Sequence, residues 1–216
     1  MTKTEHFYKV LLVAQSGSGK TMSAQNLKRE TTGFLNVENK PLPFKGDFKY
    51  HIVPKTINDV TNTLIEWAKN PEINCIFIDS LSAIFDMVLL DCRAKFKGFD
   101  VWNNYAEIIQ KLIDLIKRIP KEIFMTAHYE VLGIEGNLEK RVKVQGKMLE
   151  GVIEKDFTIV LYGSRRFDEK GKPKYSYNLV EDGASAKCPP GIFGEDTMQI
   201  PNDCSLILEA ITEFKK

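Results

Sequence analysis

Residues 8–29 read YKVLLVAQSGSGKTMSAQNLKR, and this stretch decides the fold. The apolar run Val10–Val13 predicts a buried strand. The polar run Met22–Arg29 contains good helix formers and predicts a helix. Between them lies a turn with two glycines, Gly17 and Gly19. A strand, a glycine-rich turn and a helix start in this order are the context that a phosphate-binding loop requires.

The residues of this turn predict a nucleotide site. Glycines let successive backbone N–H groups point into one concavity, which can hold the oxygens of an anion. Lys20 is expected to reach the β- and γ-phosphates of ATP, and the Thr21 hydroxyl is expected to bind Mg²⁺. In the usual pattern G-x-x-x-x-G-K-[ST] the first position is glycine, but here it is Ala14, which fits where φ is negative. The residues expected to bind the nucleotide are Gln15, Ser16, Gly17, Ser18, Gly19, Lys20, Thr21 and Met22.

Composition indicates one globular domain. The chain has 216 residues, of which 43% are hydrophobic and 27% charged, and we expect residues 1–216 to form a single domain. A net charge of +1 excludes a polybasic nucleic-acid binder, so any nucleic-acid contact must come from a local patch. No apolar run approaches about 18 residues, so we expect no membrane partner. The four cysteines form no C-x-x-C pair, which argues against zinc and favours reduced thiols in the cytoplasm.

Apolar periodicity predicts the remaining elements. We expect helices at residues 57–69, 81–91, 105–118 and 205–214, and strands at 33–38, 50–53, 74–80 and 122–128. Alternating helices and buried strands indicate an α/β fold with a mostly parallel sheet covered on both faces. Residues 157–162 and 175–180 are expected to form a hairpin at the sheet edge, because a charged turn with glycine joins them.

Three of these strands end in a polar side chain, and ligands of parallel sheets lie beyond such ends. Asp79 is expected to hold Mg²⁺ through water, or alternatively to cap the helix that follows. Glu38 is the candidate to polarise the attacking water, although it could be a solvated loop carboxylate. His128 is the candidate to contact the γ-phosphate and report it to the next segment; alternatively it is a half-buried histidine bonded to a backbone carbonyl. Lys20, Glu38 and His128 are therefore the expected catalytic residues.

The order of these motifs resembles the RecA-like core ATPases. Residues 79–83, DSLSA, look like the second nucleotide motif of RecA. The strand end MTAH at 125–128, the basic segment after it and PPGIF at 189–193 resemble a phage group of small nucleotide-binding AAA proteins linked to single-strand annealing and recombination. The resemblance covers most of residues 8–194. It implies a P-loop NTPase with a RecA-like sheet, without the additional end domains of RecA, in the host cytoplasm if a phage encodes the chain.

The resemblance also implies partners. The family assembles on single-stranded DNA as a ring or filament with ATP between subunits, and a single-strand DNA-binding protein is a further candidate partner. The loops expected to face DNA are residues 93–104, with Phe96, Phe99 and Trp102 available to stack on bases, and residues 129–151. The residues expected to bind DNA are Lys140, Arg141, Lys143 and Lys147. The candidates for a cation that acts on the site of a neighbouring subunit are Arg165, Arg166 and Lys187.

Three functions are compatible with the sequence. The first is a DNA-dependent, Mg²⁺-requiring ATPase of recombination or strand annealing. The second is a small-molecule phosphotransferase; such enzymes usually carry an arginine-rich lid, whereas residues 139–147 contain mostly lysine and one arginine. The third is a nucleotide-bound assembly protein with little hydrolysis, which Ala14 leaves open.

Overall fold

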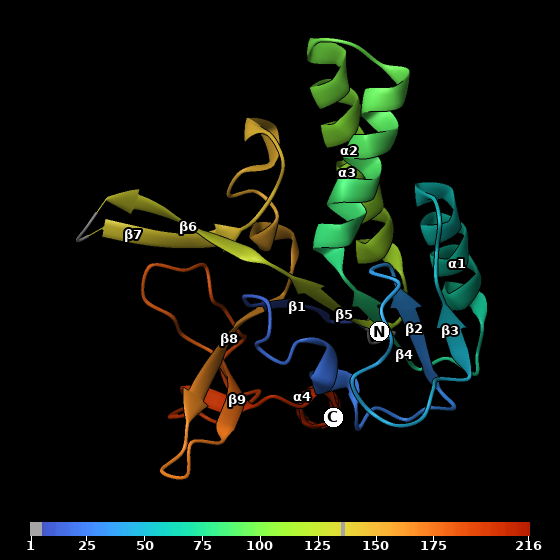
Figure 1. The fold of residues 1–216 in the computed structure, drawn as a ribbon. Helices are drawn as coiled ribbons and strands as arrows, with labels where there is room; N and C mark the ends of the chain where they lie inside the picture. Colours follow the sequence, from blue (N-terminus) through green and yellow to red (C-terminus); the bar gives the residue numbers. More distant parts are fainter. Residues whose placement is uncertain (1–5, 135–136) are drawn as a thin grey trace, which may run out of the picture.

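The central strand of the molecule is β1 (Lys9–Val13), which lies between the parallel strands β5 (Glu122–Ala127) and β8 (Ile159–Phe167). The computed structural model describes residues 6–134 and 137–216 (Figure 1). The other strands of this eight-stranded sheet are β2 (Thr32–Asn36), β3 (Tyr50–Ile52), β4 (Cys75–Asp79), β9 (Pro173–Asn178) and β10 (Gln199–Pro201).

The strand order is β10-β9-β8-β1-β5-β4-β2-β3. All pairings from β8 to β3 are parallel, and β9 and β10 extend the sheet with antiparallel pairings. The predicted α/β class with a mostly parallel sheet is therefore confirmed. The expected β8–β9 hairpin is present, but β10 rather than the hairpin forms that edge of the sheet. The carboxyl ends of β1, β2, β4 and β5 meet at one edge, because these strands are parallel neighbours.

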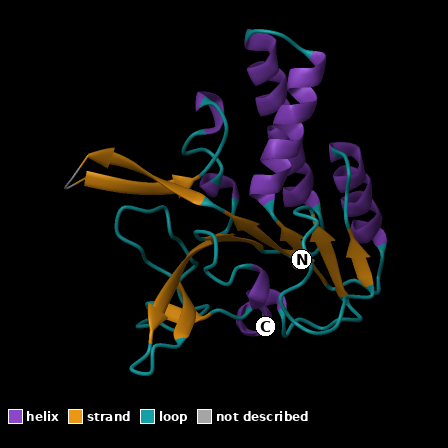
Figure 2. Ribbon diagram, in the orientation of Figure 1, coloured by secondary structure: helices purple, strands orange, loops and turns teal. Residues whose placement is uncertain are grey.

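Helices cover the two faces unequally (Figures 1 and 2). The helices α1 (Ile57–Lys69), α2 (Leu81–Lys95) and α3 (Phe99–Arg118) pack on one face, and α4 (Cys204–Phe214) packs on the other. Both faces of β1, β4 and β5 are consequently buried, which explains why their sequences are continuous apolar runs. Among the described residues, no helix combines the length and apolar character that a membrane span needs.

The prediction of a helix at Met22–Arg29 is wrong. Only the short 3-10 helix η1 (Thr21–Ala24) follows the phosphate loop. The Ser23 hydroxyl donates to the backbone oxygen of Lys20 at 2.6 Å, a local bond that competes with helix propagation. Asn26 instead donates to the Asp203 carboxylate at 2.7 Å, so tertiary contacts outweigh helix propensity here.

The prediction of a basic and aromatic loop at 93–104 is also wrong, because most of these residues are helical. The chain turns between α2 and α3 at Gly98, which adopts a positive φ of 59°. Phe99 is 72% exposed on α3. Trp102 is half-buried and packs edge to face on Tyr105, with ring centroids 6.4 Å apart.

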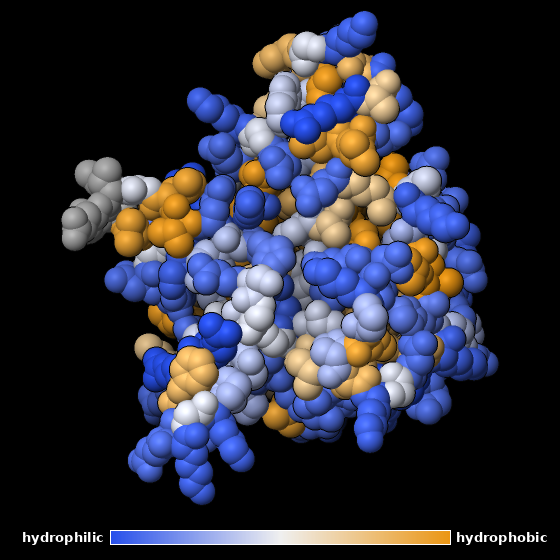
Figure 3. Space-filling view, viewed as in Figure 1, coloured by the Kyte–Doolittle hydropathy of each residue, from blue (hydrophilic) through white to orange (hydrophobic). Residues whose placement is uncertain are grey.

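Much of the expected basic loop at 129–151 is instead a protruding hairpin (Figure 1). Its strands are β6 (Tyr129–Ile134) and β7 (Asn137–Val142), and residues 135–136 lie outside the described residues. Val131 and Leu138 are exposed on it, and Figure 3 shows apolar surface over this hairpin. Side chains alternate between the two faces of these short strands, but the many basic residues hide this pattern in the sequence. The sequence therefore predicted a loop where the structure has a hairpin. The 3-10 helices η2 (Lys147–Leu149) and η3 (Glu154–Asp156) lead from the hairpin to β8.

Candidate nucleotide site

A cavity of about 310 Å³ lies where the carboxyl ends of β1, β2, β4 and β5 meet. This volume is at the lower end of the range for ligand pockets, which is about 300–1,000 Å³. The cavity is lined by Ser16, Gly17, Ser18, Gly19, Lys20, Thr21, Met22, Glu38, Lys40, Pro43, Asp79, His128 and Tyr175. The structure thus brings together all three expected catalytic side chains and every expected nucleotide-binding residue except Gln15, which lines an adjoining cavity.

The backbone of the phosphate loop has the expected conformation. Gly17 and Gly19 have φ values of 72° and 79°, which side chains disfavour. Among the described residues, Asn39 is the only non-glycine residue with a positive φ, so Ala14 is compatible with its own position. The N–H of Ala14 donates to the backbone oxygen of Ala127 on β5 at 3.0 Å and fixes the start of the loop.

Lys20 is held by its own loop. Its side chain is 7% exposed, and Nζ donates to the backbone oxygens of Ala14 at 2.8 Å and Gln15 at 2.9 Å. Burial lowers the pKa of Lys20 to about 8, against the opposing effect of Asp79. Nζ also lies 3.3 Å from Nδ1 of His128. Burial, and then the charge of Lys20, lower the pKa of His128, so a neutral ring that accepts from Lys20 fits this contact.

Asp79 and two hydroxyls form the part of the site that fits a metal ion. Thr21 Oγ1 donates to one carboxylate oxygen of Asp79, and Thr126 Oγ1 donates to the other, both at 2.6 Å. Burial raises the pKa of Asp79, and these two hydrogen bonds oppose the rise. The peptide bond that follows Asp79 is cis. Hydroxyl and carboxylate oxygens suit Mg²⁺, which takes few protein ligands and fills its shell with phosphate and water.

No other metal site competes with this one in the described part of the chain, where no group of three or more His, Cys, Asp and Glu side chains could hold an ion. The alternative role of Asp79 as a helix cap is not what the structure has. Ser80 caps α2 instead, because its hydroxyl accepts from the backbone N–H of Ala83 at 3.2 Å.

Glu38 is bonded on both of its carboxylate oxygens. The Ser80 hydroxyl donates to Oε1 at 3.0 Å, and Lys40 forms an ion pair with Oε2. Burial raises the pKa of Glu38, but the bonds from Lys40 and Ser80 outweigh it, and the net pKa is lowered. Glu38 is therefore an ionised carboxylate at the cavity, not a solvated loop residue.

Several residues of the site were not predicted. Thr126 and Lys40 each lie two residues from a predicted one, so their position was a usable signal. Tyr175 on β9 lines the cavity, and Asn202 after β10 donates from Nδ2 to the backbone oxygen of Gly19 at 2.9 Å. Nothing in the sequence indicates these two, because distant strands bring them to the loop.

The residues expected on DNA lie on or after the β6–β7 hairpin. Lys140 forms an ion pair with Glu181, and Arg141 forms one with Glu139, so half of this positive charge is already paired. Lys143 and Lys147 are exposed. The backbone N–H of Lys143 donates to the backbone oxygen of His128 at 2.8 Å, which joins the end of the hairpin to the nucleotide site.

The three cations expected to act on a neighbouring subunit differ in position. Arg165 on β8 approaches the phosphate loop of its own chain, since one guanidinium nitrogen lies 3.7 Å from the place where a Cβ on Gly17 would be. Arg166 is exposed and follows it on the strand. Lys187 is half-buried and donates to the backbone oxygen of Lys155 at 3.3 Å.

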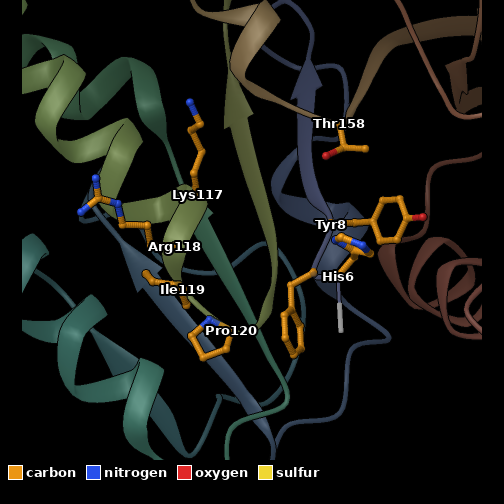
Figure 4. A pocket seen from close by; sticks show the side chains of 8 residues that line it. His6, Tyr8, Lys117, Arg118, Ile119, Pro120 and Thr158 are labelled. Atoms are coloured by element: carbon orange, nitrogen blue, oxygen red, sulfur yellow. The ribbon is translucent and has the colours of Figure 1, made fainter. Parts of the chain in front are cut away.

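A larger cavity of about 540 Å³ lies near the start of β1 (Figure 4). His6, Tyr8, Arg118, Pro120 and Thr158 are among its lining residues. It lies near the amino ends of the parallel strands, whereas nucleotide sites of such sheets lie at the carboxyl ends. We therefore do not assign it to the nucleotide.

Comparisons with known proteins identify the family and the fold of the chain. The AAA domain family matches residues 6–188. A search of curated proteins found no match. Among solved structures, a KaiC-like protein, PH0186, from the hyperthermophilic archaeon Pyrococcus horikoshii OT3 is similar in fold. Its TM-score is 0.51 at 17% identity, over 79% of this chain and 77% of that chain. Because the family match spans most of the sequence, this chain belongs to the AAA domain family, with the fold of a RecA-like P-loop ATPase.

Proposed function

We propose that this protein binds and hydrolyses ATP with Mg²⁺, that single-stranded DNA stimulates the reaction, and that it serves phage recombination or strand annealing. The observation that carries the nucleotide part is the convergence of Lys20, Thr21 and Asp79 at one cavity, with the Thr21 hydroxyl 2.6 Å from the Asp79 carboxylate. Membership of an AAA domain family supports the same reading. The DNA part is supported by the resemblance of the sequence to small phage recombination ATPases.

The side chains of the cavity suit hydrolysis. A bound Mg²⁺ would neutralise charge on the phosphate oxygens, and Thr21 and Asp79 would hold it. Lys20 exchanges its bonds to backbone oxygens for bonds to phosphate oxygens. Glu38 orients a water molecule and takes its proton as the water oxygen bonds to the γ-phosphorus and the bond to the bridging oxygen breaks. The products are ADP and inorganic phosphate, and the proton passes on to solvent.

For DNA binding we propose Lys143 and Lys147 as the principal contacts, because Lys140 and Arg141 are already paired with carboxylates. The bond from the Lys143 N–H to the His128 oxygen supports a route by which DNA on the hairpin influences the γ-phosphate side of the cavity. Cations at such positions contact phosphates without reading sequence, so the binding should weaken as salt rises.

For the additional cation we propose Arg165 acting on its own chain and Arg166 acting on a neighbour in a ring or filament. The position of Arg165 beside Gly17 supports the first assignment. The bond from Lys187 to a backbone oxygen and its half-buried position disfavour it as the residue acting on a neighbour.

The test is ATP turnover with and without single-stranded DNA, at low and high salt, together with the size of the protein in solution. Wild type should hydrolyse ATP faster with DNA, and Lys20→Ala should lose nucleotide binding. Glu38→Gln should keep ATP binding and lose most turnover, by about 100-fold. Unchanged turnover in Glu38→Gln would remove that residue from the mechanism.

Paired lysine variants test the DNA part. Lys143→Ala/Lys147→Ala should lose stimulation by DNA while keeping basal turnover. The matched control is Lys55→Ala/Lys69→Ala, which removes two exposed lysines near the ends of α1. Turnover that needs a small acceptor instead of DNA would favour a phosphotransferase, and binding without turnover would favour an assembly protein.

A further inference from the structure

We propose that Lys40 is a second phosphate-binding lysine of the site, which leaves the Glu38 carboxylate for the γ-phosphate when ATP binds and so frees Glu38 to hold water. This inference rests on the proposed function and adds a residue to it. In this proposal, the Lys40–Glu38 ion pair is the state of the site before ATP binds. In that state, the carboxylate oxygen needed for water is occupied.

The backbone of Lys40 is anchored at the cavity. The buried Asn36 side chain at the end of β2 donates from Nδ2 to the Lys40 backbone oxygen at 2.8 Å and accepts from the Lys40 N–H at 3.4 Å. The side chain of Lys40 is nevertheless 74% exposed. An anchored backbone with an exposed, flexible side chain lets the ammonium group move between partners without moving the loop.

The two carboxylate oxygens of Glu38 are held differently. Oε1 accepts from the Ser80 hydroxyl at 3.0 Å, and Ser80 is fixed as the N-cap of α2. Oε2 instead accepts from the exposed side chain of Lys40. Departure of Lys40 would therefore leave the carboxylate oriented by Ser80, with one oxygen released toward the cavity that both side chains line.

The balance of charge favours this exchange. Among the described residues that line the cavity, Lys20 and Lys40 are the lysines, and Glu38 and Asp79 are the carboxylates, so their formal charges cancel without a nucleotide. A triphosphate adds several negative charges. An ion pair whose lysine is exposed, such as Lys40–Glu38, contributes little stability, whereas bonds from a lysine to a phosphate are charge-assisted on both sides. Lys40 therefore gains by moving to the phosphate.

Hydrolysis itself keeps the balance given above. The water oxygen bonds to the γ-phosphorus, the bond from phosphorus to the bridging oxygen breaks, and the proton goes to the freed oxygen of Glu38. Lys40 forms no covalent bond. It neutralises charge on the γ-phosphate oxygens, which ADP does not have, so its contribution is specific for the triphosphate.

The experiment is calorimetric binding of ADP and of an ATP analogue with a non-hydrolysable β,γ-bridge. Lys40→Met should weaken the analogue about tenfold and ADP less than about twofold. Lys40→Arg should keep most of the preference for the analogue. The control Lys45→Met, which removes an exposed lysine of the same loop, should change neither affinity. Equal weakening of both nucleotides, or of neither, in Lys40→Met would overturn the inference.

A second variant tests the exchange. Glu38→Gln removes the carboxylate that competes for Lys40, so the analogue should bind about threefold tighter than to wild type, and this gain should vanish in Lys40→Met/Glu38→Gln. A gain that persists in the double variant would contradict the exchange. Wild-type protein that binds neither nucleotide would instead overturn the proposed function and this inference with it.

Discussion

At the residue scale, the alanine in the phosphate loop is accommodated by a glycine on the neighbouring strand. A Cβ added to Gly163 on β8 would lie 2.8 Å from the Cβ of Ala14, closer than two such atoms approach. Gly163 is not among the glycines with a positive φ, so space rather than backbone conformation requires glycine there. The two positions thus share room for one methyl group.

We expect Gly163→Ala to destabilise the protein by about 1–3 kcal/mol, because it overpacks a buried contact. The double variant Ala14→Gly/Gly163→Ala should recover most of that loss, because the methyl group only changes sides. Urea unfolding of wild type, both single variants and the double variant measures the coupling between the sites. Simple addition of the two single effects would show that the two positions do not share this space.

The buried Lys9 gives a prediction for how the free energy of unfolding depends on pH. Lys9 is 3% exposed, and its Nζ donates to the backbone oxygens of Ile119 at 2.9 Å and Lys121 at 2.7 Å. Burial lowers the pKa of Lys9 from 10.5 to about 8, although Glu122 opposes this. Between these two pKa values the unfolded chain binds more protons than the folded one, so the free energy of unfolding rises with pH.

The contribution of Lys9 should reach at most about 1.4 kcal/mol per pH unit above about pH 8. Lys20 has a similarly lowered pKa, and buried cysteines such as Cys75 also titrate in the alkaline range. The effect of Lys9 must therefore be measured as the difference between wild type and a Lys9 variant. We expect urea unfolding between about pH 7 and 10 to show wild type gaining stability relative to Lys9→Met as pH rises. Parallel curves for the two proteins would contradict the assignment.

At the element scale, the phosphate loop is supported by the last segment of the chain rather than by a long helix. Asn202 donates to the Gly19 backbone oxygen, Asp203 accepts from Asn26, and the Cys204 thiol donates to the Ser23 hydroxyl at 3.2 Å. These bonds attach the start of α4 to the loop and to η1. The AAA domain match ends at residue 188, so this support lies beyond the part of the chain that the family match covers.

We expect Asn202→Ala to weaken ADP binding about fivefold, because one hydrogen bond that shapes the loop is lost. Gln199→Ala is the matched control. Gln199 lies on β10 and bonds to Ser164 and Asn178 rather than to the loop, so its loss should leave ADP affinity unchanged. Calorimetry on the three proteins measures both effects, and equal weakening in the two variants would mean that β10 acts only through general stability.

The same elements explain how much could be predicted. Strands β1, β4 and β5 were predictable because they contain apolar runs buried on both faces. The polar residues at the ends of two of these runs, Asp79 and His128, indicated where the site lies. Lys20, Asp79 and His128 therefore converge as expected. The absence of a helix over residues 22–29 was not predictable, because Asn26 bonds to Asp203, 177 positions away in the sequence. Tyr175 and Asn202 were missed for the same reason, since a single sequence carries no signal of such contacts.

At the scale of the whole molecule, the sheet order places different kinds of side chain on the two sides of one loop. Strands β2, β4 and β5 bring the carboxylates and His128 from one side of β1, and β8 with β9 brings Arg165 and Tyr175 from the other. Arg165 and Tyr175 are paired across β8 and β9, which accounts for their both lying beside the phosphate loop. The sheet of the chain therefore places a cation, Arg165, beside its own phosphate loop.

Mixed subunits distinguish these two sources of the cation. Lys20→Ala subunits cannot use their own site but still present both arginines to a neighbour. If Arg166 acts on the neighbour, mixing Arg166→Ala with Lys20→Ala should restore turnover at about a quarter of the sites, because half of the loops are intact and half of those have an intact neighbour. If Arg165 acts on its own chain, as proposed, mixing Arg165→Ala with Lys20→Ala should restore none. Recovery in the Arg165 mixture, measured as DNA-stimulated phosphate release, would reassign Arg165 to the neighbouring site, since a residue can complete a foreign loop only across a subunit interface.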